Sequence, residues 1–228
     1  MFIGHFGAGL AAKRIAPRPS LGTLFLASQF IDLIWPILLI VGLERVEIDP
    51  GNTAVTPLNF VWYPFTHSFL GVLLWALLMG AVYFALRRNT RSAIVLGALV
   101  MSHWVLDLIT HRPDLPLLPW IDTKVGMGLW DSVALTVIVE GTIFVVGAFL
   151  YLKSTKALNA KGTFTFWLLL VFLVAIYVMN LAGPPPPSVE PIGYIGLAQW
   201  LFVAWGYWID RNRTTILHPQ GLAQAGGR

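Results

Sequence analysis

The chain has 228 residues, of which 57% are hydrophobic and only 11% charged, and its formal net charge is +4. Its mean hydropathy is +0.72. Soluble domains carry about a quarter charged residues, so this composition excludes a soluble domain and indicates an integral membrane protein. The absence of cysteine excludes disulfides, thiolate zinc sites and thioether-linked haem, so a bound metal must use nitrogen and oxygen ligands.

An apolar segment at residues 2–16 opens the chain but is too short to cross a bilayer. It can enter the membrane as a re-entrant half-helix, which would carry His5 roughly 12 Å deeper than Lys13. It can equally lie on the inner surface as an amphipathic helix. Gly4, Gly7 and Gly9 would permit the close helix contacts that a buried segment requires.

Six later apolar runs are long enough to cross a bilayer as helices. They are Leu21–Leu43, Phe65–Leu86, Ser92–Thr110, Leu129–Leu152, Phe164–Leu181 and Ile192–Ile209. The sequence therefore predicts an all-α integral membrane protein with six transmembrane helices plus the short N-terminal helix. Residues 1–210 form a single polytopic membrane domain, and the polar, glycine-rich residues 211–228 are expected to be a disordered cytoplasmic tail.

Basic and acidic residues alternate between the connections. Four connections, counting the two ends, hold 12 of the 15 basic residues: 13–18, 87–91, 153–161 and 211–228. The intervening connections are mainly acidic. The positive-inside rule then places both termini in the cytoplasm. These basic residues set the topology and need no ligand, so no nucleic-acid partner is expected.

Ionisable residues within the apolar runs are the best guide to function, because each is costly in a bilayer unless it is paired, hydrated or bound. His103, Asp107 and His111 recur at four-residue spacing and form one stripe on a helix. Asp32 and Glu140 lie near the middle of their runs, at about the depth of His103. Imidazole and carboxylate together suit a divalent metal. Because these residues lie at successive depths from the middle of the bilayer outwards, the pattern also predicts a polar funnel that opens to the extracytoplasmic side.

Four short motifs resemble a bacterial inner-membrane family of membrane-bound metal-dependent hydrolases, which is distantly similar to zinc-dependent phospholipases C. The resemblance covers roughly the first half of the chain, through Leu115–Pro119. The motifs are Gly4-His5, Phe30-Ile31-Asp32, Phe65-Thr66-His67-Ser68 and Ser102-His103-x-x-x-Asp107. The resemblance implies a bacterial inner-membrane location and a metal bound by the histidines and aspartates of these motifs, namely His5, Asp32, His67, His103 and Asp107.

The chain departs from the family pattern at two places. The family usually has Asp-x-Asp-His around the first aspartate, where this chain has Phe30 and Leu33. It also usually has His-Arg before Thr-His-Ser, where this chain reads Val61-Trp62-Tyr63-Pro64. Fewer ligands than the family pattern favour one metal ion over a multinuclear centre. We consider His111 as a replacement ligand, an inference that the resemblance does not supply.

Several local features also have a purely structural interpretation. His103 with Asp107 can be a hydrogen-bonded pair that holds helices together, which contributes about 0.6 kcal/mol in membranes. Thr66 is expected to cap the helix that follows it. Glu140 can be a general base, a partner of a metal ligand, or a packed protonated carboxyl group.

These observations leave three functions open. The first is a hydrolase with one divalent metal, zinc before others, in which Asp32 or Glu140 accepts the proton and the substrate is a membrane lipid. The second is an inactive accessory subunit that packs against other membrane proteins. The third is a pathway for protons or metal ions along the His/Asp stripe. Haem ligation by two histidines is a further alternative, but the carboxylates beside the imidazoles argue against it.

Overall fold

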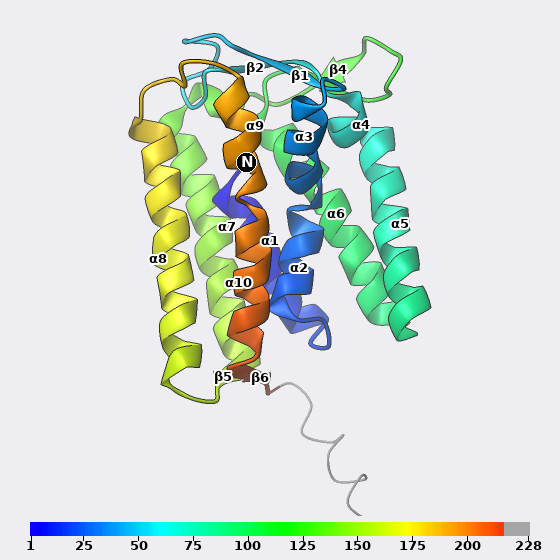
Figure 1. Ribbon diagram of the computed structural model, residues 1–228, viewed down its shortest axis with the longest axis vertical. Coiled ribbons are helices and arrows are strands. Elements are labelled where there is room, and N and C mark those ends of the chain that lie inside the picture. The colour runs from blue at the N-terminus through cyan, green and yellow to red at the C-terminus, as the bar shows by residue number, and fades with distance from the viewer. Residues whose placement is uncertain (217–228) are drawn as a thin grey trace, which may run out of the picture.

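The computed structural model describes residues 1–216 and shows a mostly helical bundle whose long helices run in one general direction (Figure 1). The helices are α1 (Ile3–Ile15), α2 (Leu21–Ser28), α3 (Phe30–Ile40), α4 (Pro64–His67), α5 (Phe69–Arg87), α6 (Thr90–Thr110), α7 (Val133–Ser154), α8 (Ala160–Ala182), α9 (Glu190–Leu197) and α10 (Trp200–Asp210), with a 3-10 turn at Leu129–Asp131.

Short antiparallel strand pairs close the two ends of the bundle. These are β1 (Arg45–Ile48) with β2 (Leu58–Trp62), β3 (Leu115–Pro116) with β4 (Lys124–Val125), and β5 (Thr155–Ala157) with β6 (Arg213–Thr215). The last pair corrects one boundary of the sequence analysis, because residues 213–215 form a strand rather than the start of a disordered tail. The remainder of that predicted tail, residues 217–228, lies outside the described residues.

Five helical stretches are long and apolar enough to cross a membrane: α5, α6, α7, α8 and the stretch Glu190–Asp210, which contains α9 and α10. The predicted run Leu21–Leu43 is a bent pair, α2 and α3, with an angle of 57° at a break at Gln29. The described residues therefore hold five such helices, or six if the bent pair counts as one crossing. The prediction of a helical membrane protein is confirmed at this level.

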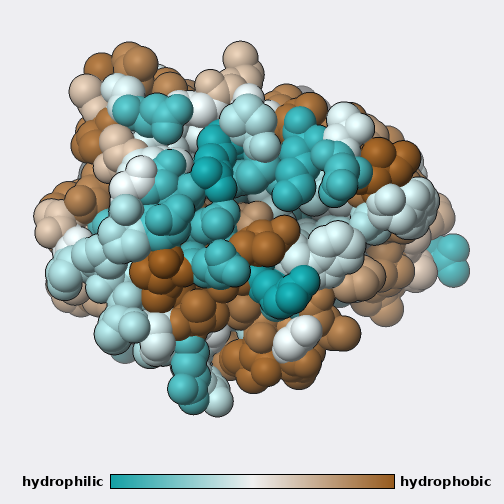
Figure 2. Space-filling model, turned by 90° about the horizontal axis from the view of Figure 1, so that it is seen from above, coloured by the Kyte–Doolittle hydropathy of each residue, from teal (hydrophilic) through white to brown (hydrophobic). Residues whose placement is uncertain are grey.

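The connections are sorted by charge between the two ends of the bundle. The α1–α2 and α5–α6 turns and the β5–β6 pair, with most of the basic residues in or beside them, lie at one end, and β1, β2 and β4 lie at the other (Figure 1). Viewed from the β1–β2 end, hydrophilic residues gather over the surface and hydrophobic residues lie among and around them (Figure 2). The charge alternation seen in the sequence thus corresponds to two different ends of the molecule.

Helix α1 lies inside the bundle, between α2, α6 and α7, and most of its residues are buried. Two glycines make this position possible. A Cβ on Gly7 would lie 2.6 Å from the carbonyl oxygen of Ile143, and a Cβ on Gly147 would collide with the carbonyl oxygen of Gly7. The backbones of α1 and α7 therefore touch, as small residues allow in membrane helix pairs. This contact carries His5 into the interior, where its side chain is 1% exposed.

We expect Gly147→Ala to destabilise the protein by about 1–3 kcal/mol, because the new methyl group meets backbone atoms of α1 that cannot rotate away. Thermal unfolding in detergent measures the effect. Gly141→Ala on the same helix is the matched control, since within residues 1–216 nothing lies within 4 Å of its added Cβ. Equal stability of the two variants would contradict the close contact of α1 with α7.

Candidate metal centre

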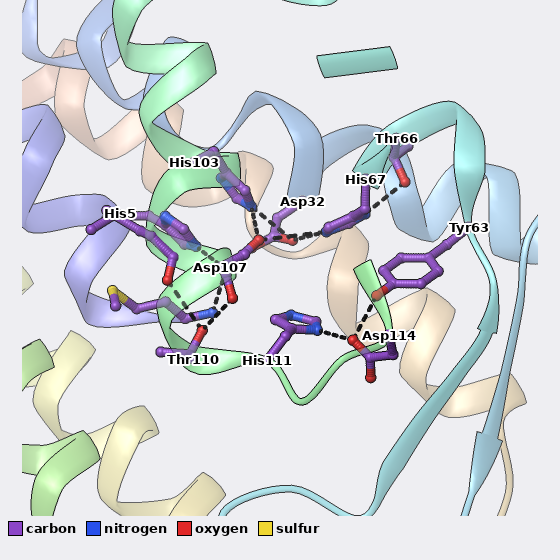
Figure 3. Close-up of polar contacts among 12 residues, drawn as sticks. His5, Asp32, Tyr63, Thr66, His67, His103, Asp107, Thr110, His111 and Asp114 are labelled. Atoms are coloured by element: carbon purple, nitrogen blue, oxygen red, sulfur yellow. Dashed lines mark hydrogen bonds and ion pairs between the residues drawn. The ribbon is translucent and has the colours of Figure 1, made fainter. Parts of the chain in front are cut away.

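Four side chains from three helices meet in the bundle interior: Asp32 of α3, His67 of α4, and His103 and Asp107 of α6 (Figure 3). The Nε2 atom of His103 lies 3.5 Å from Asp32 Oδ1 and 3.2 Å from Asp107 Oδ2. The Nε2 atom of His67 lies 3.6 Å and 3.9 Å from the same two oxygens. Each of the two imidazole nitrogens therefore lies close to both carboxylates.

The break between α2 and α3 orients His103. The carbonyl oxygen of Ser28, at the end of α2, lies 2.9 Å from His103 Nδ1. A carbonyl oxygen accepts only, so Nδ1 donates and a neutral ring carries its lone pair on Nε2. Within the described part of the chain, this buried Nε2 makes no hydrogen bond.

A hydrogen-bonded chain orients His67 in the same way. Thr66 donates its hydroxyl hydrogen to Glu44 Oε2 at 2.6 Å, so Thr66 Oγ1 accepts from His67 Nδ1 at 2.7 Å. The prediction that Thr66 caps the following helix is wrong, because Ser68 accepts from the Gly71 amide and caps α5 instead. Thr66 is used to fix the ring of His67, whose lone pair is left on Nε2.

These two orientations have an electrostatic consequence. Two neutral rings with their lone pairs on Nε2 would repel the carboxylate oxygens 3.2–3.9 Å away. A cation between the four atoms, either a proton or a metal ion, converts this repulsion into attraction. The arrangement therefore has the donor set and the polarity of a cation site.

His5 joins this cluster through the other oxygen of Asp107. Its Nε2 lies 3.0 Å from Asp107 Oδ1, which also accepts from the amino group of Met1 at 2.7 Å. The His5 ring stacks on His103 with ring centres 3.6 Å apart. Among residues 1–216, two groups of side chains are close enough to share a metal ion: His5, His103 and Asp107, and Asp32, His67 and His103.

Glu140, the second candidate for proton transfer, is buried on α7 and points to the start of α1. Its Oε2 accepts from the amides of Phe2 at 2.8 Å and Gly4 at 3.3 Å. A carboxylate at these first-turn amides stabilises a helix N-terminus. Glu140 therefore helps to hold α1, and with it His5, against the cluster.

His111 is placed differently from the other histidines of the predicted set. It follows the last residue of α6 and belongs to neither candidate metal group. Its Nδ1 lies 2.9 Å from Asp114 Oδ1, which also accepts from the Tyr63 hydroxyl at 3.0 Å. Burial outweighs the hydrogen bond to Asp114 and lowers the pKa of His111, so the ring is neutral at pH 7. Trp130 packs on the ring, with ring centres 4.2 Å apart.

A cavity of about 940 Å³ connects these groups. Asp32, His67, Asp107, His111 and Glu140 all line it. Asp32 is the most accessible of the four clustered side chains, with 21% of its side-chain surface exposed, whereas those of His67, His103 and Asp107 are at most 5% exposed. The cavity also reaches residues 50–58 between β1 and β2, at the end opposite most of the basic connections.

The structure thus brings five of the six predicted metal ligands into one cluster and separates His111 from it. The sequence analysis did not find the groups that orient the rings, which are Ser28, Glu44, Thr66, Tyr63 and Asp114. One of them carried a usable signal, because Asp114 follows His111 at three-residue spacing. Thr66 directly precedes His67, but its contact with Glu44 is not a local pattern. Ser28 acts through its backbone, and Glu44 and Tyr63 lie far in the chain from the groups that they bond.

Comparison with known protein families returns a match to a family of inner membrane proteins. The architecture is that of a helical membrane protein. The profile of the YdjM inner membrane protein family matches residues 2–184, and the chain belongs to this family of bacterial inner membrane proteins. Searches among curated proteins and among solved structures return no match. The family match includes all the clustered residues and ends before α9.

The orientation of the two rings is directly measurable. We expect ¹⁵N NMR of histidine-labelled protein in detergent to show Nδ1 protonated in both His67 and His103, since each Nδ1 faces an acceptor. His67→Gln and His103→Gln, which each remove one signal, supply the assignment. A neutral ring protonated on Nε2 at either position would contradict the hydrogen-bonding scheme.

Proposed function

We propose that this chain is a membrane-embedded metal-dependent hydrolase that binds one divalent ion, zinc in preference to others, through Asp32, His67, His103 and Asp107. One observation carries the proposal: two oriented imidazole nitrogens, from α4 and α6, each lie 3.2–3.9 Å from a carboxylate oxygen of Asp32 and from one of Asp107. The resemblance seen in the sequence supports the same residues.

The donor set and spacing fit zinc. Zinc binds imidazole nitrogen and carboxylate oxygen at about 2.0–2.2 Å in a tetrahedral arrangement, which puts neighbouring ligand atoms about 3.4 Å apart. Hydrogen bonds from the far side of each ring, such as those to Ser28 and Thr66, are typical of zinc-bound histidines. His5 would then act mainly on Asp107, whose Oδ1 it contacts.

The ion would supply Lewis-acid polarisation of the scissile bond, and a phosphoester is the class suggested by the resemblance to phospholipases C. Proton transfer falls to this chain's own residues. Asp114 holds the Nδ1 hydrogen of His111 and leaves Nε2 as the acceptor, in a ring that lines the cavity. His111 is therefore a better proton carrier than Glu140, which is engaged with α1, and Asp32 is assigned to the ion.

We also propose six membrane crossings with both termini in the cytoplasm. The bent pair α2–α3 serves as the first crossing, and α1 is a re-entrant helix inside the bundle. The support is the sorting of basic connections to one end (Figure 1). The cavity then opens towards the extracytoplasmic side of the inner membrane.

A structural role is the second candidate, and a specific observation favours it. Each clustered residue ties separate helices together, as when Asp107 of α6 binds Met1 and His5, or when His103 binds Ser28 at the end of α2. With a proton in place of the metal ion, the same cluster would hold an accessory subunit of a membrane complex in shape.

Elemental analysis distinguishes these two functions. We expect the detergent-purified wild type to hold one zinc, manganese or iron ion per chain, and His103→Ala and Asp107→Ala to lose it. Asp122→Ala, at an exposed position in a loop, is the control and should keep the ion. Reconstituted wild type should then release products from phospholipid vesicles, as followed by mass spectrometry, and Asp107→Ala should not. A folded, metal-free wild type would refute the hydrolase.

The group that orients His67 provides a finer prediction. Thr66→Val keeps the side-chain shape but removes the hydroxyl between His67 and Glu44. We expect zinc affinity, measured by competition with a chelating dye, to fall about 10–100-fold. Thr165→Val is the matched control, because within residues 1–216 its buried hydroxyl donates to the Lys161 carbonyl of the same helix and to no other group. Unchanged affinity in Thr66→Val would show that His67 is not a ligand.

A further inference from the structure

The cavity has two chemically different parts. Its inner end is the polar cluster, where Asp107 and His111 are almost fully buried. Its walls further out are apolar and come from α8 and from the α9–α10 stretch. The wall residues include Phe172, Ile176, Phe202 and Trp205. A pocket of this size, close to the upper limit for small-molecule sites, accommodates an elongated ligand with one polar end.

The cavity also reaches the side of the bundle. Three of its lining residues are among the most exposed apolar side chains of the chain: Met179 of α8 is 69% exposed, Ile195 of α9 is 72% exposed, and Leu201 of α10 is 68% exposed. Both stretches that carry them are apolar enough to span a membrane. A mouth bordered by such residues faces lipid rather than water.

Two polar atoms on the walls have no partner within residues 1–216. They are the hydroxyl oxygen of Tyr177, whose side chain is 6% exposed, and Oε1 of Gln199. Both residues line the cavity. A buried polar group without a hydrogen bond is unfavourable, so a ligand that bonds to these atoms would bind more tightly. An ester carbonyl, found between the headgroup and the chains of a phospholipid, can accept from the Tyr177 hydroxyl. Gln199 Oε1 is itself an acceptor and can bond only to a donor, such as an ammonium or hydroxyl group of the headgroup.

From these three observations we propose that the cavity binds an ester-linked membrane phospholipid that enters sideways from the bilayer between α8 and the α9–α10 stretch. Its acyl chain lies along Phe172, Ile176 and Phe202, its ester region accepts from Tyr177, and a donor group of its headgroup bonds to Gln199 Oε1 while the phosphate reaches the His/Asp cluster. The proposal rests on the proposed function for the chemistry at the headgroup, but the binding itself requires only the walls.

The α9–α10 wall is beyond the part of the chain matched by the family. That match ends at residue 184, whereas the cavity is lined by Gln199, Leu201, Phe202 and Trp205. The clustered donors thus belong to the matched segment, and part of the apolar cavity wall belongs to the segment after it. We infer that the α9–α10 stretch sets which lipid this chain selects.

Photolabelling tests the proposal. The chain is reconstituted in phosphatidylethanolamine vesicles that contain a small fraction of phosphatidylethanolamine with a diazirine in its acyl chain. Lipid around the outside of the protein labels only exposed side chains. We expect additional labelling of the buried Tyr177 and Phe202, which outside lipid cannot reach. Labelling confined to exposed residues would overturn the proposal.

Variants at the mouth provide the matched comparison. Ala198→Trp places a large side chain at an exposed cavity-lining position and should abolish labelling of Phe202. Ala175→Trp, at an exposed position of α8 that does not line the cavity, should leave it intact. Leu201→Trp repeats the test should Ala198→Trp fail to fold. Equal labelling of Phe202 in the folded mouth variants and in Ala175→Trp would overturn the sideways entry.

The polar contact and the metal are tested separately. Tyr177→Phe should weaken lipid retention about two- to tenfold, as expected for one lost hydrogen bond, whereas Tyr194→Phe, an exposed tyrosine outside the cavity, should not. The labelling is repeated on protein treated with EDTA. Labelling that persists after EDTA would show that lipid binding does not require the metal. Internal labelling of a wild type that is already metal-free when purified without chelator would refute the hydrolase but leave the lipid site standing. A wild type that holds the metal but shows no labelling of Tyr177 or Phe202 would overturn the lipid site and leave the metal-binding part of the proposed function standing.

Discussion

The cost of burying ionisable groups in an apolar bundle governs this structure. His5, His67, His103 and Asp107 are all at most 5% exposed at their side chains. An isolated charge in such a place is strongly unfavourable, so each must be paired or bound. The rings of His67 and His103 meet this requirement on one side, where Nδ1 makes a hydrogen bond. On the other side, Nε2 of each ring faces the carboxylates. The side facing the carboxylates still requires a cation.

Several of the polar side chains are positioned by the breaks and ends of helices. Asp32 lies in the first turn of α3 after the break at Gln29, and the same break presents the Ser28 carbonyl to His103. His67 ends α4, and His111 follows the end of α6. At such points backbone groups lose their partners within the helix and become available to side chains. The polar site is therefore located where the helices are interrupted, at the closed end of a cavity that can receive a ligand.

Two parts of the molecule contribute differently to the proposed chemistry. Residues 1–154 carry the candidate ligands, the orienting groups and Glu140, while the segment from α8 to α10 adds apolar walls and two polar atoms that have no partner within residues 1–216. In the proposed function, the first part therefore carries the chemistry and the second part determines which lipid binds. A change in the walls can alter the bound lipid without disturbing the donors, because those helices provide none of the clustered side chains.

The sequence by itself determined the membrane class, the apolar runs and the pairing of His103 with Asp107, because composition and helical periodicity are local properties of the chain. The tertiary structure decided the rest. The burial of α1 depends on a backbone contact between Gly7 and Gly147, residues that no local pattern connects. His111 shares a stripe with Asp107, but α6 ends before it, so its ring turns to Asp114 instead. Periodicity defines the face of a helix, whereas distances between helices depend on side-chain packing and on where each helix stops.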